Sequence, residues 1–106
     1  MSDFCQLWLS CKDAKEASKI ADVLLSNKLV ACSKQILVKS SFHWQGKIEG
    51  SDEILLMMES RADLFDQIEE AVTKLHSYDT FVLEAVPVSK VSTKAEKWLT
   101  QELKNA

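Results

Sequence analysis

The pattern of apolar and polar positions predicts four strands and three helices. Apolar residues flank Gln6 between Phe4 and Leu9, as expected for a first strand. Further extended segments are expected at residues 29–44, with a polar interruption near residues 33–35, at residues 54–58 and at residues 81–88. The remaining apolar positions follow helical spacing, in the order strand, helix, strand, strand, helix, strand, helix.

The first helix is predicted by a capping signal and an apolar stripe. Asp13 can cap its start, and Glu16, three residues later, completes a capping box. Asn27 is a plausible stop. The stripe between them contains Ala17, Ile20, Ala21, Leu24 and Leu25.

The second and third helices carry similar signals. Ser60 is expected to cap the second helix, with Asp63 at the capping-box position. Thr93 and Glu96 are expected to open the third helix. The second stripe contains Leu64, Phe65, Ile68, Ala71, Val72 and Leu75, and the third helix offers Trp98, Leu99 and Leu103 for packing.

Residues 41–60 predict a hairpin whose second strand is buried on both faces. Trp44-Gln45-Gly46-Lys47 is typical of a tight reversal, and residues 54–58 are five consecutive large apolar residues. A strand that is apolar at every position must be covered on both faces. Helices from a chain of 106 residues can cover one face of a small sheet. We therefore expect other copies of the chain to cover the second face.

The element order predicts an α+β fold of the ferredoxin-like β-α-β-β-α-β type with an extra C-terminal helix. Residues 1–106 are expected to form a single domain, because the length leaves no room for a second. Right-handed crossovers place both main helices on one face of the sheet. The bare face would exceed the apolar patch that a soluble monomer usually tolerates.

Composition narrows the class of protein. The chain is 46% hydrophobic and 27% charged, with a net charge of −3, which argues against a nucleic-acid footprint. The N-terminus is too short and too polar for a signal peptide or a membrane span. Cys5, Cys11 and Cys32 form no C-x-x-C pair, which favours reduced thiols in a cytoplasmic protein.

Three common uses of this architecture do not match the residues. An RNA-recognition domain stacks bases on aromatic residues of its third strand, and residues 53–59 contain none. A copper chaperone of this fold needs C-x-x-C after the first strand, and this chain has none there. An acylphosphatase needs an arginine near the first loop, which this chain also lacks. Catalytic arrangements are also lacking, so we expect a protein that is not an enzyme.

Four segments resemble, in order, the landmarks of the CutA family. They are Lys28-Leu29-Val30-Ala31-Cys32, Trp44-Gln45-Gly46-Lys47-Ile48-Glu49, Leu75-His76-Ser77-Tyr78 and Ala85-Val86-Pro87-Val88. The family reads roughly K-L-A-A-C, W-x-G-K-I/L-E, H-P-Y and L-P-V, and the match runs from Asp13 to Trp98. The resemblance implies a homotrimer akin to the PII signalling proteins and linked to divalent-ion tolerance, especially copper tolerance. It also implies long second and third strands that pair with neighbouring subunits.

The chain departs from the family pattern beside the expected cleft between subunits. Ile36-Leu37-Val38 stands where the family usually has Ile-Pro-Gly, Ser77 replaces the proline of H-P-Y, and Phe81-Val82 replaces a Pro-Glu pair. These changes bear on any shared ligand site and leave the fold prediction intact.

His76 and Cys11 are the candidate metal ligands. His76 resembles the family's H-x-Y histidine, and a neutral imidazole suits Cu(II) or Zn(II). The alternative is a histidine whose positive form interacts favourably with a helix C-terminus. Some bacterial relatives have a cysteine at the position of Leu9 and a second histidine at that of Leu75. Cys11 would point to the same side as Leu9 if the strand continued.

Cys32, Trp44, Lys47 and Tyr78 are the other candidate binding residues, at the cleft between subunits. An aromatic wall and one cation could hold a small anion there. The alternatives are a small buried hydrophobe for Cys32 and an interface anchor for Trp44.

Two functions follow from the resemblance. The first is a trimer in divalent-metal tolerance that binds Cu(II), another divalent metal or a small ligand weakly and requires no cofactor. The second is a trimeric structural or signalling scaffold that docks partner proteins and binds no metal specifically.

Overall fold

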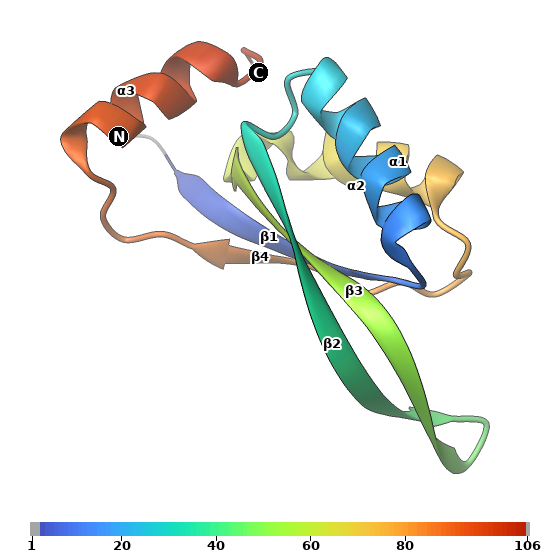
Figure 1. The fold of residues 1–106 in the computed structure, drawn as a ribbon. Helices are drawn as coiled ribbons and strands as arrows, with labels where there is room; N and C mark the ends of the chain where they lie inside the picture. Colours follow the sequence, from blue (N-terminus) through green and yellow to red (C-terminus); the bar gives the residue numbers. More distant parts are fainter. Residues whose placement is uncertain (1–2, 106) are drawn as a thin grey trace.

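A four-stranded antiparallel sheet whose first two helices lie on one face forms the fold (Figure 1). This computed structural model describes residues 3–105. The sheet order is β2-β3-β1-β4, which confirms the predicted ferredoxin-like topology. In chain order the elements are β1 (Phe4–Cys11), α1 (Ala14–Ser26), β2 (Cys32–Trp44), β3 (Lys47–Arg61), a 3-10 turn (Ala62–Leu64), α2 (Phe65–Leu75), β4 (Leu83–Pro87) and α3 (Thr93–Glu102).

Helices α1 and α2 lie on the same face of the sheet (Figure 1). On this face Leu7 pairs with Met58 and Leu9 with Leu56, and all four side chains are fully buried. The core is completed by the apolar stripes of the two helices, with Ala17, Ile20, Ala21, Leu24, Ile68 and Val72, and by Leu64 of the 3-10 turn.

The opposite face of the sheet keeps apolar side chains in contact with solvent. Trp8, Leu55 and Met57 are half-buried there, while Ile36 and Val86 are 41% and 45% exposed. Residues 54–60 of β3 therefore have one buried face and one partly exposed face within this chain, whereas residues 47–52 are exposed on both faces. The described residues 3–105 do not cover this second face. Its coverage by other copies of the chain therefore remains a prediction.

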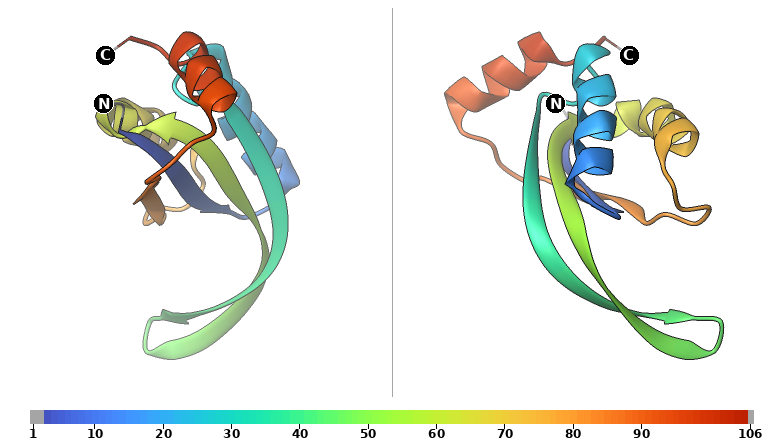
Figure 2. Two further views of the ribbon diagram at one scale, coloured as in Figure 1. Left: turned by 90° about the vertical axis from the view of Figure 1, so that its left-hand side faces the viewer. Right: turned by 45° about the vertical axis from the view of Figure 1, so that its right-hand side comes forward.

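The β2–β3 hairpin projects beyond the rest of the chain (Figure 2). With the hairpin, the described chain measures 45 × 25 × 20 Å. The reversal of the hairpin confirms the prediction at Gln45 and Gly46, whose φ angles are 49° and 79°. Two consecutive positive φ angles are typical of the two-residue turn that matches the twist of paired strands. Leu37 and Ile48 on this hairpin are 84% and 76% exposed.

The start of α1 matches its sequence signals. Asp13 Oδ1 accepts a hydrogen bond from the Glu16 N–H at 2.9 Å, and Asn27 is the residue after the helix. Glu16 Oε2 accepts from the N–H of Lys12, one residue before the cap, at 2.9 Å. The capping box thus extends into the preceding loop.

The predicted cap of α2 is wrong. Ser60 lies on β3, fully buried, and its hydroxyl donates to the Leu29 carbonyl at 2.6 Å. The chain passes through the 3-10 turn before α2 begins at Phe65, and Asp63 accepts from Arg61 Nε at 2.6 Å. The Ser60 hydroxyl binds the buried Leu29 carbonyl instead of capping α2, because a buried carbonyl without a donor costs free energy.

Several strand limits also differ from those predicted. β1 continues past Leu9 to Cys11, while β4 begins at Leu83 instead of Phe81 and ends at Pro87. β4 pairs with β1 alone, at the sheet edge where a proline is tolerated. None of the helices within residues 3–105 is long and apolar enough to cross a membrane.

Candidate functional site

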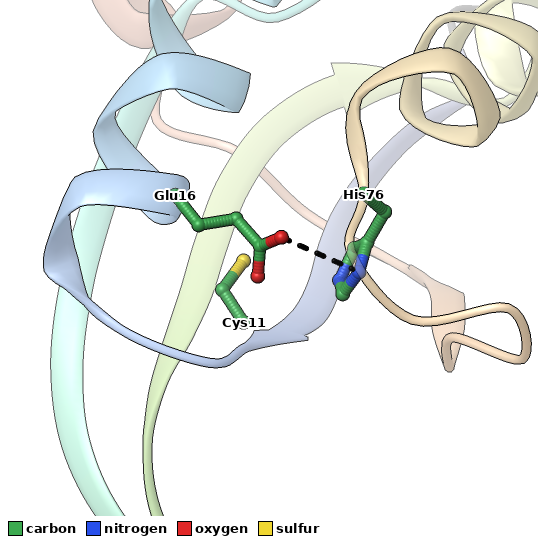
Figure 3. A group of neighbouring side chains, drawn as sticks. All are labelled: Cys11, Glu16 and His76. Atoms are coloured by element: carbon green, nitrogen blue, oxygen red, sulfur yellow. Dashed lines mark ion pairs between the residues drawn. The ribbon is translucent and has the colours of Figure 1, made fainter.

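Cys11, Glu16 and His76 converge from three separate elements (Figure 3). Cys11 ends β1, Glu16 lies in the first turn of α1, and His76 follows the last residue of α2. One donor atom from each lies within 4.8 Å of the others. The predicted pair of Cys11 and His76 is therefore brought together, because β1 continues far enough to place Cys11 on the side of Leu9.

The ring of His76 is enclosed and both of its nitrogens are in use. Its side chain is 0% exposed. Nε2 lies 2.8 Å from the Ser10 carbonyl oxygen, and Nδ1 accepts the Tyr78 N–H at 3.0 Å. A carbonyl can only accept, so Nε2 carries the proton and Nδ1 presents its lone pair.

This hydrogen-bond pattern identifies a neutral imidazole. The 3.9 Å contact between His76 Nδ1 and Glu16 Oε1, dashed in Figure 3, is consequently not an ion pair in this protonation state. A neutral ring is the form that can ligate a metal. The helix-dipole interpretation of His76 needs the positive form, which this pattern disfavours.

Glu16 ties two loops together as a buried carboxylate. Only 7% of the residue is exposed, and its Oε1 accepts the Ser77 N–H at 2.7 Å while Oε2 binds Lys12. Burial opposes the charge, but the hydrogen bonds from Lys12 and Ser77 hold the pKa of Glu16 below its usual value. We did not predict Glu16 as a site residue, although its place in the capping box was the available signal.

The thiol of Cys11 is protonated at neutral pH. Its side chain is fully buried, and this burial raises its pKa to about 12. The carboxylates of Glu16 and Glu53 add to the rise. A metal ion at this sulfur would have to displace a tightly held proton.

Tyr78 and Phe81 surround the histidine from the loop after α2. The ring of Phe81 stacks on His76, with centroids 5.2 Å apart and an angle of 18° between the planes. The Tyr78 hydroxyl donates to Glu53 Oε2 at 2.6 Å. Burial, together with this bond, raises the Tyr78 pKa far above its ordinary value. Phe81, which replaces a family proline, thus encloses the candidate ligand.

The other predicted binding residues do not meet within one chain. Trp44 and Lys47 face each other at the tip of the hairpin, and Trp44 is 53% exposed. Tyr78 binds Glu53, which lies six residues along β3 from Lys47, or about 20 Å. Cys32 starts β2, half-buried, on the face that the helices leave open. The cleft between subunits to which these residues were assigned remains a prediction.

An open groove of about 410 Å³ runs between the start of α1 and the base of the hairpin. Its lining residues are Lys12, Asp13, Ala14, Leu37, Val38, Lys39, Asp52, Glu53 and Ile54. Sequence reasoning missed this groove, because it depends on how the hairpin lies against the loop that precedes α1.

The donor set of Cys11, Glu16 and His76 suits a borderline cation. Sulfur, carboxylate oxygen and imidazole nitrogen together fit Cu(II) or Zn(II) better than Mg²⁺ or Ca²⁺. Among the described residues, every buried side-chain nitrogen and oxygen already has a hydrogen-bond partner. An ion must therefore break existing hydrogen bonds, which makes weak binding the expectation.

Comparison with known proteins places the chain in a family. Residues 5–102 match the family model described as CutA1 divalent ion tolerance protein. A divalent-cation tolerance protein CutA from Pyrococcus horikoshii is 32% identical over 92 residues, covering 87% of this chain and 90% of that protein.

Solved structures agree over nearly the whole chain. The periplasmic divalent cation tolerance protein CutA from Archaeoglobus fulgidus gives a TM-score of 0.93 at 29% identity, covering 95% of this chain and 99% of that one. CutA from Xylella fastidiosa gives 0.92 at 31% identity, covering 97% and 100%. The sequence and structural matches together show that this chain belongs to the family of CutA1 divalent ion tolerance proteins.

Proposed function

We propose that this protein acts in divalent cation tolerance as a homotrimer that binds Cu(II), or a similar divalent cation, weakly. Cys11, Glu16 and His76 would hold the ion. The observation that carries this proposal is the convergence of sulfur, oxygen and nitrogen donors from three elements within 4.8 Å. The proposed role is binding, without catalysis.

Weak binding follows from the contacts of the three donors. The lone pair of His76 Nδ1 is occupied by the Tyr78 N–H, and both Glu16 oxygens accept backbone hydrogen bonds. Cys11 must lose a proton whose pKa is raised to about 12. Affinity should therefore rise with pH, since the thiolate is the ligating form.

The proposed trimer rests on the uncovered face of the sheet and on the projecting hairpin. Half-buried Trp8, Leu55 and Met57 lie on that face, and Leu37 and Ile48 are exposed on the hairpin. Exposed apolar surface of this kind commonly marks an interface. A threefold arrangement would bury these side chains against other copies of the chain.

The two histidines of the chain provide a matched test. We would titrate chelator-stripped protein with Cu(II) and record native mass spectra of the wild type, His76→Gln and His43→Gln. We expect a trimer that takes up one copper per subunit, with uptake lost in His76→Gln and kept in His43→Gln, whose residue lies exposed on the hairpin. Unchanged uptake in a folded His76→Gln trimer would overturn this site.

A scaffold that binds no metal is the second candidate. The observation that favours it is the complete set of hydrogen bonds around the cluster, which holds the loops together without an ion. A wild-type trimer that takes up no copper would support the scaffold. We propose a cytoplasmic location in either case, and fractionation of cells would test it against the periplasmic description of the relative from Archaeoglobus fulgidus.

A further inference from the structure

Tyr78 makes one hydrogen bond into the cluster and one into the hairpin. Its backbone N–H donates to His76 Nδ1 at 3.0 Å, and its hydroxyl donates to Glu53 Oε2 at 2.6 Å. Glu53 lies on β3, is 8% exposed and lines the open groove. One residue thus connects the candidate ligand atom to the wall of the groove.

The cluster is closed to solvent as it stands. The side chain of His76 is 0% exposed and that of Glu16 is 6% exposed. The loop after α2 closes the cluster through two backbone donors, because the N–H groups of Ser77 and Tyr78 occupy Glu16 Oε1 and His76 Nδ1. The Tyr78 N–H must leave before an ion can bind His76 Nδ1, because that nitrogen has a single lone pair, whereas Glu16 Oε1 keeps a second lone pair beside the Ser77 N–H.

Moving the Tyr78 backbone also disturbs the Tyr78 side chain. A buried N–H that loses its acceptor is costly, so the loop shifts until the N–H finds water or another acceptor. The short bond from the hydroxyl to Glu53 is then strained or broken. Glu53, left as a buried carboxylate without that donor, must reorient toward solvent, which in this region is the groove.

We propose that Tyr78 couples the cluster of Cys11, Glu16 and His76 to the open groove at the hairpin base, so that a cation at the cluster releases Glu53 and reshapes the groove. This inference rests on the proposed metal function and adds the structural change that metal binding would cause. The groove is built partly from the hairpin residues Leu37 and Val38. Metal occupancy would therefore change the surface that a partner or a neighbouring subunit meets.

The coupling is reciprocal, because two linked sites must change each other's affinity by the same factor. Any change that weakens the bond between Tyr78 and Glu53 makes the loop easier to open. Tyr78→Phe removes that bond and keeps the backbone N–H on His76. The substitution should therefore tighten Cu(II) binding about tenfold, which corresponds to about 1.4 kcal/mol.

Hydrogen–deuterium exchange with and without Cu(II) tests the coupling directly. In the wild-type trimer we expect copper to speed exchange severalfold both in residues 76–80 and at the hairpin base around Glu53. In Tyr78→Phe we expect copper to change residues 76–80 alone, with the tighter binding seen by calorimetry. For each protein, exchange with copper is compared with exchange of the same protein without copper. A difference in thermal stability between Tyr78→Phe and the wild type therefore does not affect the test.

The outcomes separate the two proposals. A loop response without a hairpin response in the wild type, an equal hairpin response in Tyr78→Phe, or an unchanged affinity in that variant would each overturn the coupling and leave the metal site standing. No copper uptake and no loop response in the wild type would overturn both proposals.

Discussion

Met57 and Met58 are neighbours on β3, yet their side chains lie on opposite faces of the sheet. Met58 pairs with Leu7 and is fully buried on the face that α1 and α2 cover. Met57 pairs with Trp8 and Lys34 on the open face and is half-buried. We therefore expect Met58 to matter for the stability of the subunit and Met57 for the proposed trimer.

Met58→Asp should unfold the protein. The change buries a charge without a partner, which typically costs several kcal/mol, and Leu56→Asp should do the same. Circular dichroism and thermal melting of the two variants check this expectation. A cooperative melt at the wild-type temperature would show that this face of β3 is not the core.

Met57→Asp should leave the subunit folded and prevent trimer formation. The new carboxylate can reach solvent in the isolated chain, but it would be buried against another copy in the proposed assembly. Light scattering after size-exclusion chromatography measures the mass, and circular dichroism confirms the fold. A folded Met57→Asp trimer would place the interface elsewhere.

Gly46→Ala should weaken the hairpin. Gly46 has φ of 79°, where a side chain is strained by about 1–2 kcal/mol, although nothing lies within 4 Å of its added Cβ. Gly50→Ala is the matched control, because its Cβ would meet only the Ser40 carbonyl at an ordinary 3.6 Å. Urea unfolding of both variants gives the comparison. Equal losses of stability would argue against the strained turn.

Cys5 and Cys11 should resist alkylation in the folded protein. Burial raises the pKa of Cys5 to about 11 and that of Cys11 to about 12, so at about pH 8 little reactive thiolate is present. Mass spectrometry after iodoacetamide treatment, with and without denaturant, measures the protection. Rapid labelling of Cys11 in the native protein would contradict its placement and weaken the proposed metal site.

The sequence was sufficient for the fold because its local signals agree with its topology. The reversal at Gln45-Gly46, the cap at Asp13 and the apolar stripes all specify elements that the structure contains. Ser60 shows where such reasoning fails. A serine before an acidic residue resembles a cap, and only the tertiary structure reveals the buried Leu29 carbonyl that it satisfies.

The candidate site was only partly predictable. His76 was proposed from the family resemblance and Cys11 as a substitute for a cysteine of some relatives, and the structure places their donor atoms within 4.8 Å. The carboxylate of Glu16 reaches the Ser77 N–H across 61 residues of sequence, a contact that no local pattern shows. The bond between Tyr78 and Glu53 likewise depends on how the loop after α2 lies against β3.

Glu16→Gln should make the free energy of unfolding depend less on pH in the acidic range. The pKa of Glu16 is lowered in the folded protein from a reference value of 4.5, so its stabilisation is complete above that value. The stabilisation is lost as the pH falls through the lower folded pKa, because the unfolded chain binds the proton more tightly. At neutral pH the variant should be less stable by about 1.5–3 kcal/mol, since the charge that accepts two backbone hydrogen bonds is gone.

Unfolding in urea from about pH 3 to about pH 7 measures this effect. The wild type should lose stability on acidification more steeply than Glu16→Gln. Glu70→Gln is the control, because Glu70 is 73% exposed and forms only a surface pair with Lys74 at 3.6 Å, so it should keep the wild-type slope. Parallel profiles for the wild type and Glu16→Gln would mean that the carboxylate does not hold the two loops together. The closed state of the cluster, on which the proposal of weak metal binding depends, would then lack its main support.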